Sequence, residues 1–194
     1  LGLRSENKYD TTSEKLFERI EKELISPKEK MELLKHYVYS VIIQHEDMHT
    51  KNLSLIYDKD LVFFAPLYDV SCTGIYDTSK GYDTHLTING KQSNIRPNDF
   101  KALCKILKID FKEFKEEAFK IAKLYEIELP SYIEEIKALG SIPFYKKKQK
   151  PRIGEGAYLK VSKIPIEFHE LLSKFHKERV EHLKALGWII NESL

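Results

Sequence analysis

The stretch Gln44-His45-Glu46-Asp47-Met48-His49-Thr50-Lys51-Asn52 concentrates polar side chains between two apolar segments. The segment before it starts at Ser26-Pro27-Lys28-Glu29, where an N-cap residue, a proline at the first helical position and an early glutamate predict a helix. The segment after it contains residues 53–57 and 61–64 around a short polar turn, which predicts a β-hairpin. The order of helix, polar loop and hairpin is therefore the framework from which the rest of the fold is predicted.

Helical patterns also dominate the rest of the chain. Thr11 with Glu14 predicts a capping box before an apolar pattern, and Asp110 with Glu113 predicts another. The further elements expected, in chain order, are a loop over 66–83, a short strand over 85–88 that ends at the turn Asn89-Gly90, helices at about 98–108, 111–127 and 131–139, and a last helix from about 166 to 186 that stops at Gly187. The sequence therefore predicts a mainly α fold with a small antiparallel β insertion.

Two parts of the chain differ in charge. Residues 141–194 hold 11 basic and 6 acidic residues, whereas residues 1–140 hold 21 basic and 24 acidic ones. We therefore divide the chain into a core, residues 1–140, and a C-terminal part, residues 141–194, made of a basic loop and a final helix. Because no aromatic platform is interleaved with the basic residues, we interpret the basic loop as solvated rather than as a nucleic-acid site.

The composition of the 194 residues excludes several classes of protein. With 42% hydrophobic residues the chain is too apolar to be disordered, and no apolar run reaches the roughly 18 residues of a membrane span. A formal net charge of +2 makes no general case for nucleic-acid binding. The chain has only two cysteines, Cys72 and Cys104. So low a number argues against a secreted disulfide framework and favours a cytoplasmic protein, with export into a host cell left open. The chain begins with Leu1 rather than Met, and we expect it to be a piece of a longer protein.

Two chemistries fit the polar loop. His45-Glu46-Asp47-Met48-His49 matches the H-E-x-x-H pattern, in which two histidines one helical turn apart bind Zn²⁺ and the glutamate acts as general base. This interpretation requires the preceding helix to continue through Asn52. It also needs a third ligand, for which Asp69 and His85 are the nearest candidates. A zinc peptidase is therefore one hypothesis.

Asp47 and Asn52 also match the D-x-x-x-x-N of a phosphotransferase catalytic loop. In such a loop the aspartate accepts the proton of the substrate hydroxyl, and the asparagine oxygen holds Mg²⁺. The hairpin that follows leads to Asp69, which stands where a second Mg²⁺-binding carboxylate is needed. Lys51 and His49 can add positive charge near phosphate. One constellation thus explains a catalytic loop, a hairpin and a metal carboxylate in the right order.

Several motifs of this sequence, taken together, resemble those of the HipA-like serine/threonine kinases. The stretch Asp47-Met48-His49-Thr50-Lys51-Asn52 with Leu53-Ser54-Leu55 resembles the D-x-H-x-K-N-x-S motif of the family, and Ala65-Pro66-Leu67-Tyr68-Asp69-Val70 resembles its A-P-x-Y-D segment. Upstream, Leu1-Gly2-Leu3 with Lys8-Tyr9-Asp10 resembles the entry to its C-terminal lobe. Downstream, Leu86-Thr87-Ile88-Asn89-Gly90-Lys91 resembles its strand–turn–Lys element. The similarity is clear over residues 1–127 and weak from Gly140 onward.

The resemblance implies a kinase-like C-terminal lobe of an ATP- and Mg²⁺-dependent protein kinase related to bacterial toxin kinases. Asp47 would then be the catalytic base, and Asn52 and Asp69 would ligate Mg²⁺. His49 and Lys51 would lie near the phosphates and the catalytic carboxylate. The implied partners are a protein that is phosphorylated on serine or threonine and, as for many family members, a helix-turn-helix antitoxin.

The sequence departs from the family at Gln44-His45-Glu46, where small or polar residues are common, so that Glu46 adds a second carboxylate beside Asp47. A kinase also needs a phosphate loop and an ATP-binding lysine on an N-terminal lobe, and the residues before Asp47 supply neither. We therefore expect that lobe to lie outside this chain, in a longer protein or on a separate polypeptide. A degenerate lobe that binds a partner without phosphotransfer is the remaining alternative.

Overall fold

The computed structural model describes residues 11–24, 26–76, 78–149 and 161–190, with the backbone alone for 146–149 and 161–164. The helices are α1 (Ser13–Glu21), α2 (Pro27–Ile42), α3 (Lys101–Leu107), α4 (Phe111–Ala138) and α5 (Phe168–Leu186), and short 3-10 helices are η2 (Thr50–Asn52), η3 (Thr73–Ile75) and η4 (Pro97–Phe100). The strands form two antiparallel hairpins, β1 (Leu55–Asp58) with β2 (Leu61–Phe64) and β3 (Pro143–Gln149) with β4 (Val161–Glu167). The predicted fold class, mainly α with antiparallel β, is confirmed.

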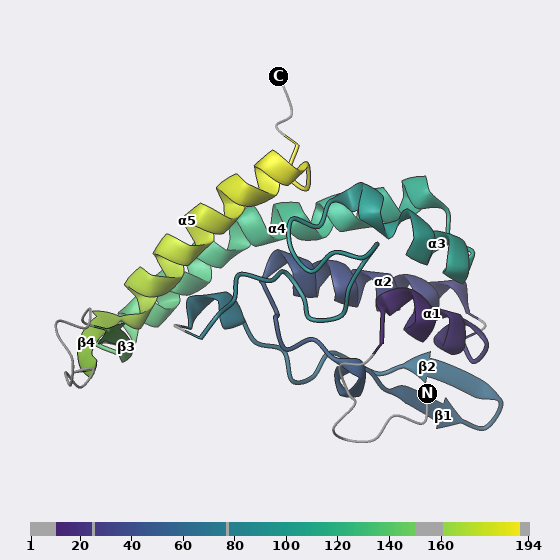
Figure 1. Ribbon diagram of the computed structural model, residues 1–194, viewed down its shortest axis with the longest axis horizontal. Coiled ribbons are helices and arrows are strands. Elements are labelled where there is room, and N and C mark those ends of the chain that lie inside the picture. The colour runs from purple at the N-terminus through teal and green to yellow at the C-terminus, as the bar shows by residue number, and fades with distance from the viewer. Residues whose placement is uncertain (1–10, 25, 77, 150–160, 191–194) are drawn as a thin grey trace, which may run out of the picture.

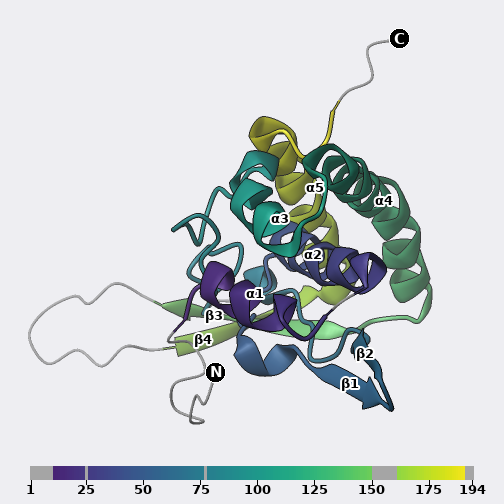
Figure 2. The same cartoon turned by 90° about the vertical axis from the view of Figure 1, so that its right-hand side faces the viewer.

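Helix α2 forms the centre of the hydrophobic core. It lies between α1 and the long pair α4 and α5, which run side by side (Figures 1 and 2). Its start follows the sequence signal, with Ser26 as the N-cap and Pro27 in the first turn. Tyr37 in its middle is fully buried and meets Phe17 of α1 edge to face, with ring centroids 4.8 Å apart. The core therefore fixes the C-terminal end of α2, where the polar loop begins.

The long helix α4 differs from the prediction of two helices at 111–127 and 131–139. It continues for 28 residues through Pro130, which lacks the N–H that a helix interior needs. Pro130 lies on the exposed side, while Ile133 is buried. Packing of α4 along α2 and α5 outweighs the local cost of the proline, about 3 kcal/mol, which sequence patterns cannot weigh.

Two other segments also differ from prediction. Residues 143–149, assigned to a basic loop, form strand β3, which pairs with β4 from Pro143 opposite Glu167 to Gln149 opposite Val161. Residues 150–160 of that predicted loop lie outside the described residues. The strand predicted at 85–88 is reduced to a bridge between Ile88 and Lys91 around the Asn89-Gly90 turn. The pairing of β3 with β4 joins segments that are distant in the sequence, so local alternation did not reveal it, whereas the bridge is a local turn.

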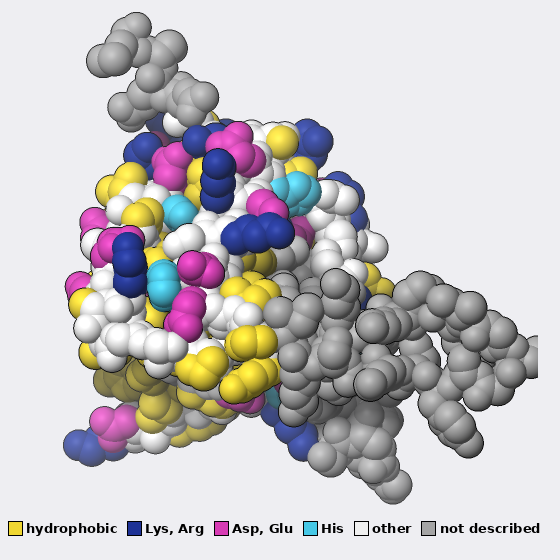
Figure 3. All heavy atoms as spheres, turned by 90° about the vertical axis from the view of Figure 1, so that its left-hand side faces the viewer, with side chains coloured by type: hydrophobic (Ala, Val, Ile, Leu, Met, Phe, Trp, Pro, Cys, Tyr) yellow, Lys and Arg dark blue, Asp and Glu magenta, His cyan; other side chains and the backbone are white. Residues whose placement is uncertain are grey.

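The surface next to the β3–β4 hairpin has mixed charge. On the face that Figure 3 shows, acidic and basic side chains are interspersed among those that the structure describes.

Within the described ranges, no helix combines the length with the apolar character that crossing a membrane requires. Both cysteines are free thiols, and burial raises the pKa of Cys72 to about 11 and that of Cys104 to about 12.

Arg179 of α5 forms a buried ion pair that joins α5 to the end of α2. Its guanidinium donates hydrogen bonds to the backbone carbonyls of Val41 and Ile42, the latter at 2.9 Å. It also pairs with the Asp83 carboxylate at 2.7 Å, and the side chains of both partners are at most 2% exposed. The other oxygen of Asp83 accepts the backbone N–H of Ile95 at 3.0 Å. A cation at a helix C-terminus satisfies carbonyls that lack a partner within the helix. This pair therefore caps the C-terminal end of α2 and joins it to α5.

We expect Arg179→Met to lower the free energy of unfolding by about 3–5 kcal/mol, because the Asp83 carboxylate would remain buried without its partner. Urea denaturation followed by circular dichroism measures this change. Lys174→Met is the matched control, since it breaks an exposed pair with Glu178, 3.9 Å apart on the same helix, and should cost less than about 1 kcal/mol. Equal effects of the two substitutions would contradict the role given to the buried pair.

Candidate active site

The polar loop, residues 44–52, leaves the end of α2 as a compact turn. Gln44 has a left-handed backbone with φ of 54°, a conformation that glycine adopts without strain. The N–H of His45 donates to the carbonyl of Ser40 at 2.9 Å, and that of Met48 donates to the carbonyl of His45 at 3.1 Å. The Met48 side chain is fully buried in the core. The loop is thus held on one side by the core while its other side faces outward.

This geometry shows that the zinc-peptidase hypothesis is wrong. The required helix would have to extend through Asn52, but α2 ends at Ile42, before the first histidine of the pattern. His45 instead forms an isolated parallel bridge with Thr84, and His49 precedes the 3-10 helix η2. Among the residues that the structure describes, no group of three or more His, Cys, Asp or Glu side chains could hold a metal ion.

Asn52 and Asp69 lie in direct contact at the base of the β1–β2 hairpin. The side-chain amide nitrogen of Asn52 donates to the Asp69 carboxylate at 2.9 Å, although the two residues are 17 positions apart. Asn52 is 1% exposed and is oriented by His49, whose backbone N–H donates to its oxygen at 2.8 Å. Asp69 is exposed and has a left-handed backbone with φ of 52°. The hairpin therefore returns the chain so that the two predicted metal ligands meet.

The donor set of this contact fits Mg²⁺. Asp69 offers a solvent-exposed carboxylate, and the bond from His49 leaves the Asn52 oxygen one further lone pair. Mg²⁺ prefers hard oxygen ligands and takes one or two from the protein, with water and phosphate oxygens filling the rest of its shell. Asn52 and Asp69 could therefore hold this ion.

The remaining predicted residues lie on the same loop in different surroundings. Asp47 is exposed and lines a cavity of about 320 Å³, hereafter the Asp47 cavity. His49 is 5% exposed, on the inner side of the loop. Lys51 is exposed on η2, and its backbone carbonyl accepts the Tyr68 hydroxyl at 2.6 Å. The carboxylate of Asp47 and the side chain of Lys51 are thus both exposed on the polar loop.

The segment after Asp69 is fastened to the start of the polar loop by Thr73. Its hydroxyl donates to the Gln44 carbonyl at 2.6 Å and accepts the Glu46 backbone N–H at 2.7 Å. Gly74 follows at a point of close approach, where an added Cβ would lie 2.4 Å from the Gln44 side chain and 2.6 Å from the ring of Phe175 in α5. Only glycine fits there without displacing a neighbour. The loop, η3 and α5 are therefore packed together.

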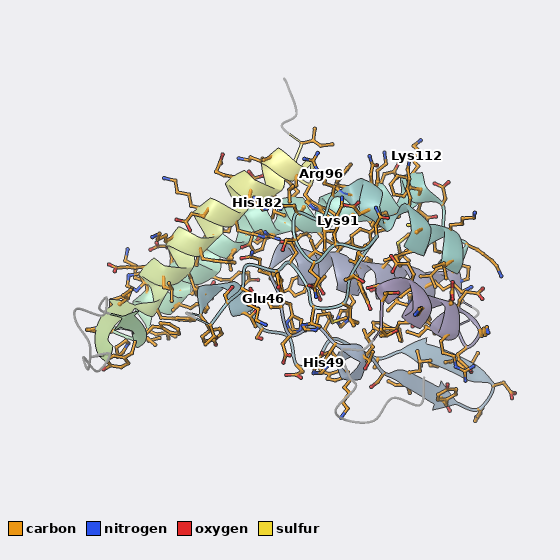
Figure 4. All side chains as sticks on the ribbon, viewed as in Figure 1. Glu46, His49, Lys91, Arg96, Lys112 and His182 are labelled. Carbon is orange, nitrogen blue, oxygen red and sulfur yellow. The ribbon has the colours of Figure 1, made fainter. Side chains whose placement is uncertain are left out.

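Glu46 has a role that the sequence did not predict. Its carboxylate accepts hydrogen bonds from residues 79–82, of which Ser79, Lys80 and Tyr82 line the Asp47 cavity. Figure 4 shows Glu46 on the loop beneath α2, with His49 nearer the β1–β2 hairpin and His182 above on α5. From the sequence, Glu46 is either the general base of a zinc peptidase or a departure from the family pattern; its bonding partners, more than 30 positions away, leave no local signal.

Two histidines lie beneath the site and are neutral at pH 7. Burial lowers the pKa of His36 to about 4, and the nearby His45 adds to this effect. Burial also lowers the pKa of His45, although the negative charges of Asp47 and Asp69 act to raise it. The His36 ring lies edge-on to Phe64 of β2, with centroids 5.6 Å apart. The hairpin therefore packs on an uncharged imidazole.

Stability should consequently depend on pH through His36. Its pKa is lower in the folded chain than in the unfolded one, so the unfolded state binds the proton first and stability falls as the pH drops from about 6.5 to about 4. The shift corresponds to a loss of at most about 3 kcal/mol. Urea denaturation between pH 7 and pH 4 should show this loss for wild type and a smaller one for His36→Gln. His182→Gln, on the partly exposed surface of α5, should follow wild type, and identical slopes for all three proteins would contradict the assignment.

Comparisons with known proteins give two similarities. Residues 1–138 match the family model described as the HipA-like C-terminal domain. Among solved structures, the fold is similar to HipA of Shewanella oneidensis MR-1 in a complex with HipB and its operator DNA, with a TM-score of 0.62 and 14% sequence identity. The match covers 98% of this chain and 40% of that chain, so the present chain spans less than half of its relative. The comparison with curated proteins found no match.

Proposed function

This chain belongs to the family of HipA-like C-terminal domains, and from that membership we propose that it is the catalytic lobe of an ATP- and Mg²⁺-dependent serine/threonine protein kinase. The observation that best supports the proposal is the 2.9 Å contact between Asn52 and Asp69. These are the two side chains that a phosphotransferase needs beside its metal, and they meet next to the loop that contains Asp47. Sequence motif and spatial arrangement therefore agree on one chemistry.

Asp47 would accept the proton of the acceptor hydroxyl. Its carboxylate is exposed on the Asp47 cavity, whose volume of about 320 Å³ is sufficient for a serine or threonine side chain with part of its backbone. Asn52 and Asp69 would hold Mg²⁺, which neutralises charge on the transferring phosphoryl group when bound. His49 would orient Asn52 through its backbone N–H, and the exposed Lys51 would add positive charge near the phosphates.

The nucleotide site would be completed by a second lobe. A kinase requires a phosphate loop and an ATP-binding lysine, and the sequence before Asp47 contains neither. The relative from Shewanella contains a further 60% of chain that has no counterpart here. We propose that the equivalent lobe belongs to the same protein or to a separate polypeptide.

The proposed partners are a protein phosphorylated on serine or threonine and an antitoxin of the helix-turn-helix type. The relative of known structure was solved with HipB and operator DNA. By analogy, this protein would contact DNA through its antitoxin rather than directly.

We expect Asp47→Asn and Asp69→Asn each to reduce phosphate transfer by about three orders of magnitude or more, because each residue acts at the transferring phosphoryl group. Transfer of radiolabelled γ-phosphate from ATP should be measured on the protein in its complete form, with its second lobe. Asp58→Asn, an exposed aspartate at the tip of the β1–β2 hairpin, is the matched control and should retain activity.

Two outcomes would contradict the proposal. Full activity in both variants would mean that the site is wrongly assigned. No transfer by the wild-type complete protein, with folding confirmed by circular dichroism, would instead support the alternative of a degenerate lobe that only binds a partner.

A further inference from the structure

We infer that Glu46 is a positioning residue, whose carboxylate holds residues 79–82 as the wall of the Asp47 cavity that receives the acceptor. This inference rests on the proposed kinase function and goes beyond it. It gives the Glu46 carboxylate, which is not one of the proposed metal ligands, a part in shaping the acceptor site.

The hydrogen bonds around Glu46 converge from one short segment. The backbone N–H groups of Lys80, Gly81 and Tyr82 donate to its carboxylate at 3.0, 2.8 and 3.1 Å, and the Ser79 hydroxyl donates to it as well. Successive backbone N–H groups that point to one place form a nest for an anion. Gly81, with φ of 76°, allows the chain to curl in this way. In this protein the anion in the nest is the Glu46 carboxylate of the polar loop.

Three residues of this segment, Ser79, Lys80 and Tyr82, line the Asp47 cavity together with Glu46 and Asp47. Glu46 and Asp47 are adjacent in the chain, so the carboxylate that holds the wall and the carboxylate proposed as the base share one peptide unit. The position of the wall is thereby fixed relative to the base. Thr73 fastens the near end of the segment to the same loop.

Glu46 supplies most of the hydrogen bonds that hold this segment: among the described residues, the others that involve residues 79–82 are from the Ser79 N–H to the Tyr76 carbonyl at 3.0 Å, from the Ser93 hydroxyl to the Gly81 carbonyl at 3.3 Å and from the Gly81 N–H to the Ser79 hydroxyl at 3.2 Å. Lys80 and Gly81 are exposed, and residues 78–82 belong to no helix or strand. The segment is bounded by the buried residues Ile75 and Asp83, and Asp83 has its own partner in Arg179. Hydrogen bonds to a charged group are stronger than those between neutral groups. Removal of the carboxylate should therefore loosen residues 79–82 while the core and the metal site stay intact.

The test compares Glu46→Ala with wild type in the complete protein. The acceptor is the peptide that wild type phosphorylates best in a serine- and threonine-containing library. We expect KM for this peptide to rise about tenfold or more, while KM for ATP changes less than about twofold. Hydrogen exchange of the Lys80, Gly81 and Tyr82 amides should become at least about tenfold faster. Glu46→Gln keeps one acceptor oxygen and should recover part of both effects.

The matched control is Glu14→Ala. The Glu14 carboxylate accepts the backbone N–H of Asn89 at 2.7 Å, so this variant also frees a loop amide, but one that does not line the Asp47 cavity. It should leave both KM values unchanged.

Each result separates the inference from the proposed function. Faster exchange with an unchanged peptide KM in Glu46→Ala would overturn the inference, since Glu46 would then only stabilise the loop. Unchanged exchange would overturn the geometry on which it stands, and an equal rise in both KM values would show a general defect and also overturn it. No phosphorylation of any library peptide by wild type would overturn the proposed function itself.

Discussion

The structure depends on one buried guanidinium. Arg179 reaches from α5 to the last carbonyls of α2 and to Asp83, and in doing so it fixes both sides of the candidate site. The end of α2 is where the polar loop starts, and Asp83 is where the segment bonded to Glu46 ends. Residue 179 lies beyond the part of the chain that matches the family model. The C-terminal helix therefore supports the candidate site from outside the matched residues.

The β1–β2 hairpin explains how two distant motifs become one site. Its four paired positions return the chain over a short distance, and Asp69 arrives beside Asn52. Tyr68 secures this return, because its hydroxyl donates to the Lys51 carbonyl at 2.6 Å and accepts from Ser54 at 2.7 Å. One face of the hairpin packs on the core near His36, while Ile56 and Leu61 on the other face are exposed. The hairpin is thus a spacer whose length sets the geometry of the proposed metal ligands.

Features that are encoded locally could be predicted from the sequence. The start of α2 at Ser26-Pro27, the hairpin and the N-cap at Asp110 each follow from a few adjacent residues. The contact between Asn52 and Asp69 was expected from the order of motifs. Features that depend on distant partners were missed: the continuity of α4 through Pro130, the pairing of β3 with β4, and the bonds of Arg179 and Glu46. No local pattern in the sequence distinguishes Arg179 and Glu46 from ordinary charged residues on the surface.

The long separation between Arg179 and its partners also concerns the order in which the chain is made. The carbonyl of Ile42, at the end of α2, accepts a hydrogen bond from the Arg179 side chain, which is synthesised 137 residues later. During translation the polar loop and the hairpin leave the ribosome well before α5 does. Until α5 docks, Asp83 lacks its counter-charge and the end of α2 lacks its cap. The completed site therefore appears only after α5 has been made, which would delay any phosphotransfer activity of a nascent chain.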